Sequence, residues 1–171
     1  MSFDTPHSPK NREINNVAAL KVPPHSVDAE QAVLGGLMLD NTEWDNLADV
    51  LLPEDFYRPE HQIIFRVMSQ QSEDRSPIDV VTLMGSLNSL NELESAGGIE
   101  YLSELTDNAR GTANIHAYAE IIRERAILRR LISVANGIAN SGYNTGGKKA
   151  AVVLDEAEQE VFSIADERPQ D

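Results

Sequence analysis

The sequence contains no cysteine, which excludes disulfide bonds, thiolate zinc sites and catalysis by a thiol. No apolar run approaches the length of a membrane span, and the N-terminus lacks the apolar core of a signal peptide. Large aromatic anchors are scarce, with one Trp, four Phe and four Tyr in 171 residues. We therefore expect a cytoplasmic protein with no membrane partner and a core built mainly from aliphatic side chains.

Positive charge is also scarce, since 14 Lys and Arg stand against 28 Asp and Glu, a net charge of −14. Residues 26–112 hold 17 acidic and 4 basic residues, whereas residues 113–147 hold 2 acidic and 4 basic residues. A protein that binds a nucleic-acid backbone must replace condensed counterions with its own cations. Direct nucleic-acid binding by residues 26–112 is therefore disfavoured.

Apolar residues recur at helical spacing along most of the chain, and no segment alternates with period two for long enough to form a strand. The pattern predicts helices over 27–40, 42–52, 59–68, 80–87 and 99–105, with Ser26 and Asp79 as N-terminal caps. Gly35 and Gly36 interrupt the first helix at a cost of about 1 kcal/mol each relative to Ala. We attribute this pair to the close approach of another helix.

These patterns predict an all-α fold in which a compact helical head is followed by a long antiparallel helical hairpin. The head covers residues 23–112 and the hairpin residues 113–166. Residues 1–22 mix polar residues with Pro and show no periodicity, which is typical of a disordered tail. Residues 167–171 have the composition of the start of a linker.

The longest helical pattern covers residues 113–140, or about 40 Å. One of its flanks is apolar in the first half, and the opposite flank becomes apolar in the second half. A closing helix over 150–164 covers only one face, so we expect the hairpin to pair with a second copy into a four-helix bundle. The candidate subunit-pairing residues are Ile127, Leu131, Val134, Ile138, Val153 and Val161.

An arginine cluster interrupts the acidic character of the chain. Two interpretations of it remain open. The cluster forms either a solvated helix face, partly paired with Glu120 and Glu124, or a docking surface for an acidic partner or a neighbouring subunit. The candidate partner-docking residues are Arg123, Arg125, Arg129 and Arg130.

Residues 142–149 (GYNTGGKK) satisfy most of the phosphate-binding pattern G-x-x-x-x-G-K-[ST]. That loop follows a strand and ends in a hydroxyl residue that binds Mg²⁺. Here a predicted helix precedes the glycines, and Lys149 occupies the last position. We interpret the segment as a turn between two helices.

The four histidines also fail to form a recognisable site. None has a Glu three residues before it, which excludes the paired Glu-x-x-His arrangement of di-iron bundles. His116 and Glu120 are one turn apart, as in a helix-surface pair. Glu60 and His61 are interpreted as an isolated couple at a helix start. We predict no catalytic residue, no cofactor site and no metal site.

Seven segments then occur in order, namely VPPHS (22–26), DAEQAVLGGLMLD (28–40), DFYRPEH (55–61), IDVVTL (78–83), GGIEYL (97–102), ANIHAYAEIIRE (113–124) and LRRLI (128–132). Together they resemble the N-terminal domain of DnaB-family replicative DNA helicases, over residues 22 to about 166. The resemblance implies a head and hairpin that pair into the collar of a hexamer. It also implies that the collar receives primase, and that a linker leads to a motor domain.

The resulting hypothesis is a non-catalytic assembly and partner-docking domain that recruits primase or helicase-loader proteins. ATP, Mg²⁺ and DNA would be bound by a motor domain outside these 171 residues. One alternative is a stand-alone helical adaptor protein. Another is an enzyme that uses carboxylates of the head on a small substrate, which would need a concave polar pocket there.

Overall fold

The computed structural model describes residues 21–109 and 114–166, and every regular element within these ranges is helical. The all-α fold predicted from the sequence is therefore confirmed. The head contains α2 (Val27–Leu39), η1 (Asn41–Glu43), α3 (Trp44–Ala48), η2 (Pro53–Asp55), α4 (Pro59–Glu73), α5 (Val80–Ser89) and α6 (Gly98–Ala109). The hairpin contains α7 (Ile115–Tyr143) and α8 (Ala150–Asp166).

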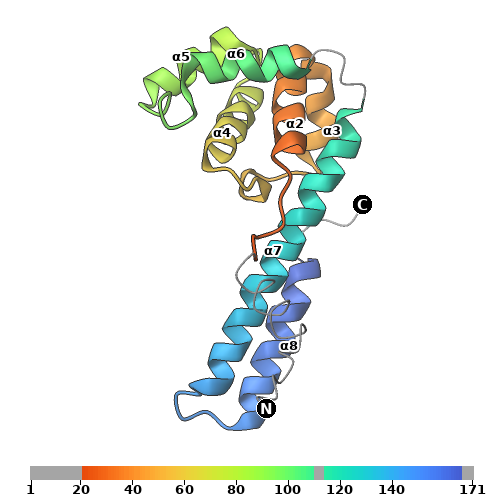
Figure 1. Ribbon diagram of the computed structural model, residues 1–171, viewed down its shortest axis with the longest axis vertical. Coiled ribbons are helices and arrows are strands. Elements are labelled where there is room, and N and C mark those ends of the chain that lie inside the picture. The colour runs from red at the N-terminus through yellow and green to blue at the C-terminus, as the bar shows by residue number, and fades with distance from the viewer. Residues whose placement is uncertain (1–20, 110–113, 167–171) are drawn as a thin grey trace, which may run out of the picture.

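Figure 1 shows the head at one end of α7, while α8 folds back along the other half of that helix. The expected tail over residues 1–22 lies almost wholly outside the described residues. The expected boundary between head and hairpin at residue 112 and the expected linker at 167–171 also lie outside them.

The predicted caps are present because their side chains satisfy the first free N–H groups of each helix. The Ala29 N–H donates to Ser26 Oγ at 3.2 Å. The Thr82 N–H donates to Asp79 Oδ1 at 2.8 Å, and the Asp79 N–H donates to Thr82 Oγ1 at 3.0 Å. These local bonds fix where α2 and α5 begin.

The segment after α2 differs from the single helix expected over 42–52. The Thr42 N–H donates to Asp40 Oδ1 at 3.0 Å, so the cap is Asp40 and the first turn is the 3₁₀ helix η1. The Asn41 side chain binds the backbone of Ile78 through both its oxygen and its nitrogen. This long-range contact sets the start of the segment, and α3 ends early at Ala48.

The long helix also runs further than the expected end at Asn140. It continues to Tyr143, and the Asn144 N–H still donates to the Asn140 carbonyl at 2.9 Å. The turn is made instead by Gly146 and Gly147, whose φ angles are +62° and +83°. Glycine is favoured there because positive φ is disfavoured for residues with a Cβ.

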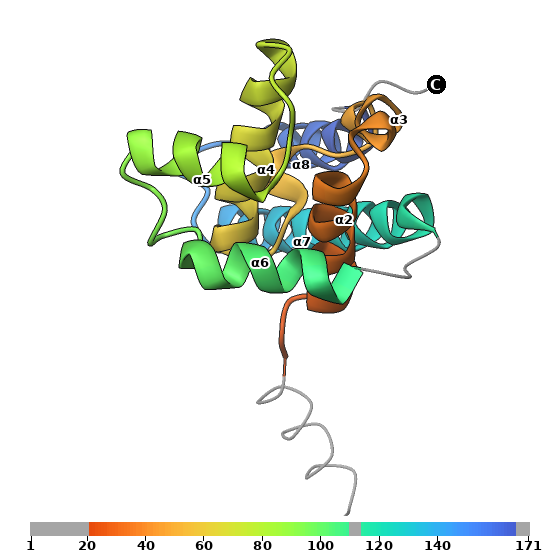
Figure 2. The same cartoon turned by 90° about the horizontal axis from the view of Figure 1, so that it is seen from above.

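Helix α2 is the centre of the head and packs against α4, α6 and α7 (Figure 2). A Cβ added to Gly35 would lie 2.1 Å from the Leu105 carbonyl oxygen, and one added to Gly36 would lie 2.6 Å from Ile115 Cδ1. The close helix crossings expected at these two glycines are thus confirmed. The crossings bring α6 and the start of α7 onto the same helix.

Candidate functional site: the hairpin and its joint with the head

Helix α7 changes partner along its length, as the sequence predicts. In its first half Ala119 and Ile122 are buried against the head core. Beyond Ile122 no described hairpin side chain is buried, and the half-buried residues of α7 include Val134, Gly137 and Ile138, which share the side toward α8. The second half of the hairpin is therefore covered on one side only.

The six predicted subunit-pairing residues fall into two groups. Ile127, Val134, Ile138 and Val153 are half-buried within the hairpin. Leu131 and Val161 are 45% and 48% exposed. The geometry of one chain thus leaves Leu131 and Val161 available to a second chain, and it partly covers the other four.

Further large apolar side chains are exposed beside these two. At about 100° per residue, Leu128, Leu131 and Ile132 lie on the flank of α7 next to its α8-facing side. Because α8 runs antiparallel, Leu154 and Val161 lie on the same side of the hairpin. We call this set the hairpin face: Leu128, Leu131, Ile132, Leu154 and Val161, all of which are exposed.

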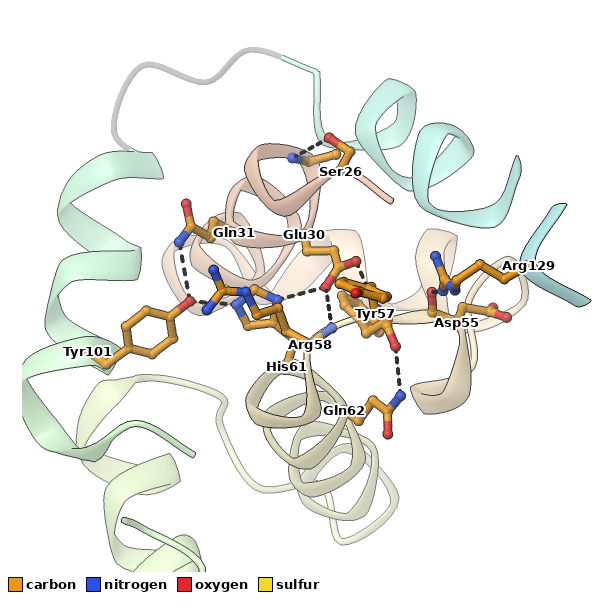
Figure 3. Close-up of polar contacts among 12 residues, drawn as sticks. Ser26, Glu30, Gln31, Asp55, Tyr57, Arg58, His61, Gln62, Tyr101 and Arg129 are labelled. Atoms are coloured by element: carbon orange, nitrogen blue, oxygen red, sulfur yellow. Dashed lines mark hydrogen bonds and ion pairs between the residues drawn. The ribbon is translucent and has the colours of Figure 1, made fainter. Parts of the chain in front are cut away.

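Arg129 joins the hairpin to the head. We call this contact of Arg129 with Pro24, Asp55 and Tyr57 the joint. Its Nη1 donates to the Pro24 carbonyl at 2.7 Å, and its Nη2 donates to the Asp55 carbonyl at 2.6 Å. Its guanidinium carbon lies 5.5 Å from the ring centroid of Tyr57, and that ring stacks on His25 with centroids 4.0 Å apart. Arg129 is therefore bound to two separate segments of the head, and Figure 3 shows its side chain beside Asp55 and Tyr57.

The other three predicted docking arginines are half-buried on the same helix. Arg129 and Arg130 line a cavity of about 390 Å³ at the joint, together with Asp55 and Ile164. The cluster is therefore divided. Arg129 holds the joint, and Arg123, Arg125 and Arg130 stay candidates for docking. The expected surface pair of His116 and Glu120 is present, with Nε2 and Oε1 3.8 Å apart.

A buried polar network continues from the joint into the head. The carboxylate of Glu30 accepts hydrogen bonds from the Tyr57 N–H at 2.9 Å, from the Arg58 N–H at 3.3 Å and from His61 Nδ1 at 2.8 Å. The other ring nitrogen of His61 lies 2.5 Å from the Tyr101 hydroxyl. Glu30 and His61 are both buried, and Figure 3 shows these side chains spanning α2, α4 and α6.

The bonding pattern assigns the protons of this network. A carboxylate only accepts, so His61 carries a hydrogen on Nδ1, and in the neutral ring Nε2 is then the acceptor for the Tyr101 hydroxyl. That hydroxyl in turn accepts from Gln31 Nε2 at 3.2 Å. Burial raises the pKa of Tyr101, which keeps its hydroxyl protonated as a donor. The network is fully paired and therefore stabilises the head rather than offering a reactive group.

The electrostatics of the joint follow from its partial burial. Burial lowers the pKa of Arg129, and the negative charges of Glu30 and Asp55 oppose that shift. The intrinsic pKa of guanidinium is so high that the group stays charged at neutral pH. It thus acts as a permanent donor to the two carbonyl groups.

The sequence interpretation missed His61 as a structural residue. Glu60 and His61 were expected to form an isolated couple, but the partner of His61 is Glu30, 31 residues away. The signal was the position of Glu30 on the apolar stripe of α2, where an unpaired carboxylate would be costly. A carboxylate on a buried helix face therefore indicates that a buried partner exists, but the sequence does not show which residue that partner is.

The described residues contain no cluster of three or more His, Cys, Asp or Glu that could hold a metal ion. Residues 142–149 begin in the last turn of α7 and end in Lys149, so a helix stands where a phosphate-binding loop has a strand, and the terminal hydroxyl residue is missing, as predicted. Within the described ranges, no helix is both long and apolar enough for a membrane span.

These features define a class of protein, in which an all-helical head is joined to a helical hairpin with one uncovered apolar side. Residues 22–124 match the family model of the DnaB-like helicase N terminal domain, and the chain belongs to this family. The five segments that supply Pro24, Glu30, His61, Tyr101 and Arg129 are among those that carried the sequence resemblance. These five segments, which are distant in the sequence, therefore meet in the folded chain at the joint and in the buried polar network.

Individual relatives agree with this assignment. The replicative DNA helicase DnaB of Haemophilus influenzae is 48% identical over 151 residues, which cover 88% of this chain and 32% of the relative. The chain spans about a third of the length of the curated relatives it matches.

Solved structures show the same fold. The crystal structure of the N-terminal domain of DnaB helicase from Mycobacterium tuberculosis matches with a TM-score of 0.79 and 34% identity, covering 83% of this chain and 99% of that one. The N-terminal domain of DnaB helicase from Helicobacter pylori, described with its interactions with primase, matches with a TM-score of 0.58 and 28% identity. That match covers 68% of this chain and 90% of the other.

Proposed function

We propose that the chain is the assembly and partner-docking part of a hexameric replicative DNA helicase. Two hairpins pair through their hairpin faces, and the pairs build a collar that receives primase or a helicase loader during DNA replication. ATP and Mg²⁺ are bound, and DNA is unwound, by other parts of the full-length protein in the cytoplasm. The observation that carries the proposal is the uncovered apolar side of the hairpin.

Physical argument supports pairing at this face. Two antiparallel helices cover one stripe on each other, yet α7 and α8 each carry a second apolar flank on the same side. Removing a half-exposed Leu or Val side chain from water contributes about 1 kcal/mol, scaled from full burial. Five such residues in each of two chains are enough to offset part of the cost of association.

Primase docking is proposed because two of the similar structures are of DnaB proteins described with primase interactions. Arg123, Arg125 and Arg130 are the candidate contacts for an acidic partner surface, because charge complementarity raises the rate and specificity of association. Arg129 is expected to act indirectly, since its donors already bind head carbonyls.

The test is sedimentation equilibrium of the chain and of the double variant Leu131→Glu with Val161→Glu. Wild type should associate, and the variant should be monomeric, because four carboxylates per pair would be buried without partners. Both residues are exposed in one chain, so circular dichroism should show unchanged helix content.

A matched control keeps the added charge but moves it. Asn140→Glu with Gln159→Glu places two carboxylates on exposed positions of the other side of the hairpin. This variant should associate like wild type. A monomeric wild type at high concentration, or equal loss of association in both variants, would contradict the proposal.

A further inference from the structure

A groove of about 500 Å³ lies between α4 and α5. Figure 1 shows α5 at the end of the head away from the hairpin. Hydroxyl and amide side chains make up most of its lining, including Gln70, Gln71, Thr82 and Ser86. Asp74 is the charged residue among those that line it. A volume of this size is typical of binding sites, which span about 300–1,000 Å³. The groove shares no residue with the hairpin face or the joint.

Gln71, which lines this groove, has a buried side-chain atom without a hydrogen-bond partner among the described residues. Its side chain is 5% exposed, and its Nε2 donates to the Pro77 carbonyl at 2.8 Å and to Thr82 Oγ1 at 3.0 Å. Because a carbonyl only accepts, the bond to Pro77 fixes which end of the amide is nitrogen. Oε1 is thus an acceptor, and no donor from the described part of the chain reaches it. A buried acceptor without a donor is costly, and because Oε1 is itself buried, a donor in the groove reaches it only when the Gln71 side chain turns.

The neighbouring surface of α5 is unusual for so acidic a head. None of the ten residues of α5 is charged. Val81 is 70% exposed, and the space around a Cβ at Gly85 is open. Leu90, directly after the helix, is also exposed. Depletion of charge and exposed aliphatic side chains are typical of the centre of a protein–protein interface.

We propose that the groove between α4 and α5 is a docking site for a short basic segment of a partner protein. The segment lies over Gln71, places a positive charge near Asp74 and packs its apolar part on Val81 and Leu90. Asp74 has no ion-pair partner among the described residues, so its carboxylate is available to a Lys or Arg. The acidic head attracts such a segment before contact and repels an acidic one.

The test selects short random displayed peptides on the whole chain, without assuming a natural partner. Enriched peptides should contain Lys or Arg, and a synthetic copy should be measured by calorimetry. Gly85→Arg, which puts a cation into the groove, and Asp74→Asn, which removes the charge, should each weaken binding about tenfold or more. The control Asn88→Arg adds the same cation to an exposed position of α5 outside the lining, and should bind nearly as wild type.

A second measurement locates the contact. The side-chain amide of Gln71 should shift in the nitrogen–proton spectrum when the synthetic peptide is added, in wild type and in Asn88→Arg. Three outcomes would each overturn the proposal: no basic peptide is enriched, Gly85→Arg and Asn88→Arg weaken binding equally, or the Gln71 amide does not respond. Equal weakening would show only general attraction to the acidic head. None of these outcomes bears on the hairpin face, which the sedimentation test examines separately.

Discussion

The head and the hairpin are both built from helices with an apolar side, but they differ in how completely that side is buried. In the head, the apolar side of α2 is covered all round, and Val33, Leu34 and Leu37 are fully buried. In the hairpin, the described residues beyond Ile122 include none that is fully buried, and Phe162 is largely exposed. The head completes its core within one chain, whereas the hairpin has more apolar surface than its two helices can cover.

This difference separates two tasks. A core closed on all sides gives a stable, cooperative unit. A hairpin with an uncovered side gains its remaining stability only when a second chain covers it, so its stability depends on protein concentration. Arg129 couples the two because it binds head carbonyls from the middle of α7. Three substitutions sharpen the comparison, two in the head and one at the joint.

The largest effect is expected in the head at Gly35. An Ala there would place its Cβ 2.1 Å from the Leu105 carbonyl oxygen and 2.7 Å from Ala109 Cβ, so α2 and α6 must separate. We expect Gly35→Ala to lower the free energy of unfolding by about 3 kcal/mol, at the upper end for overpacking. Urea unfolding measures this change.

The control is Gly85→Ala, where no atom beyond the adjoining residues and the backbone of its own helix lies within 4 Å of the added Cβ. That variant should gain about 1 kcal/mol from helix propensity. Gly36→Ala should fall between the two, because Ile115 Cδ1 is the end of a flexible side chain. Equal gains at Gly35 and Gly85 would show that the crossing tolerates a methyl group.

Much of the head could be predicted because its signals are local. Ser26 and Asp79 bond to residues three positions later, and Gly35 and Gly36 stand out against helix propensity. The start of the segment after α2 could not be predicted, since Asn41 there binds the backbone of a residue 37 positions away. Local patterns carry no information on such distant partners.

The joint shows the same division between local and distant information. The sequence indicates that α7 changes partner halfway and that Arg129 lies on the flank that turns polar. It does not reveal that this flank faces Pro24 and Asp55 of the head. An arginine on a polar stripe has the same pattern whether it is solvated or bound to buried carbonyls. Helical periodicity shows which residues share a face but not which neighbour covers that face. For this reason only two of the six pairing candidates, Leu131 and Val161, are clearly exposed in the single chain.

A smaller effect is expected at the joint itself. Arg129→Met removes two charge-assisted bonds and the contact with Tyr57, and should lower the free energy of unfolding by about 1–2 kcal/mol after allowance for partial exposure. Arg129→Lys should recover little, because an ammonium cannot reach both carbonyls as the guanidinium fork does. Urea unfolding followed by helix content measures both variants.

Arg123→Met is the matched control, since it removes a half-buried arginine of the same helix that forms no hydrogen bond with the head backbone in the described part of the chain. Its effect should stay within about 0.5 kcal/mol. A similar loss in both variants would mean that Arg129 stabilises α7 alone and does not couple the hairpin to the head.

The smallest effect is expected at Asp40, an exposed cap of the head. Hydrogen bonds from the Thr42 hydroxyl and then from the Thr42 N–H lower the pKa of Asp40. A folded-state pKa below the unfolded value means that the contribution to stability is present at neutral pH and is lost as pH falls through the folded pKa.

Thr42→Val removes the stronger bond, so the Asp40 carboxyl should titrate at higher pH in an NMR titration. The stability difference from wild type should shrink as the pH falls through the lowered pKa of Asp40, where the carboxylate protonates. Thr145→Val, in the turn of the hairpin, should leave the Asp40 titration unchanged. The free energy of unfolding of Thr42→Val could instead differ from wild type by the same amount at pH 7 and in acid. The effect would then come from the loss of the hydroxyl alone and not from the charge of Asp40.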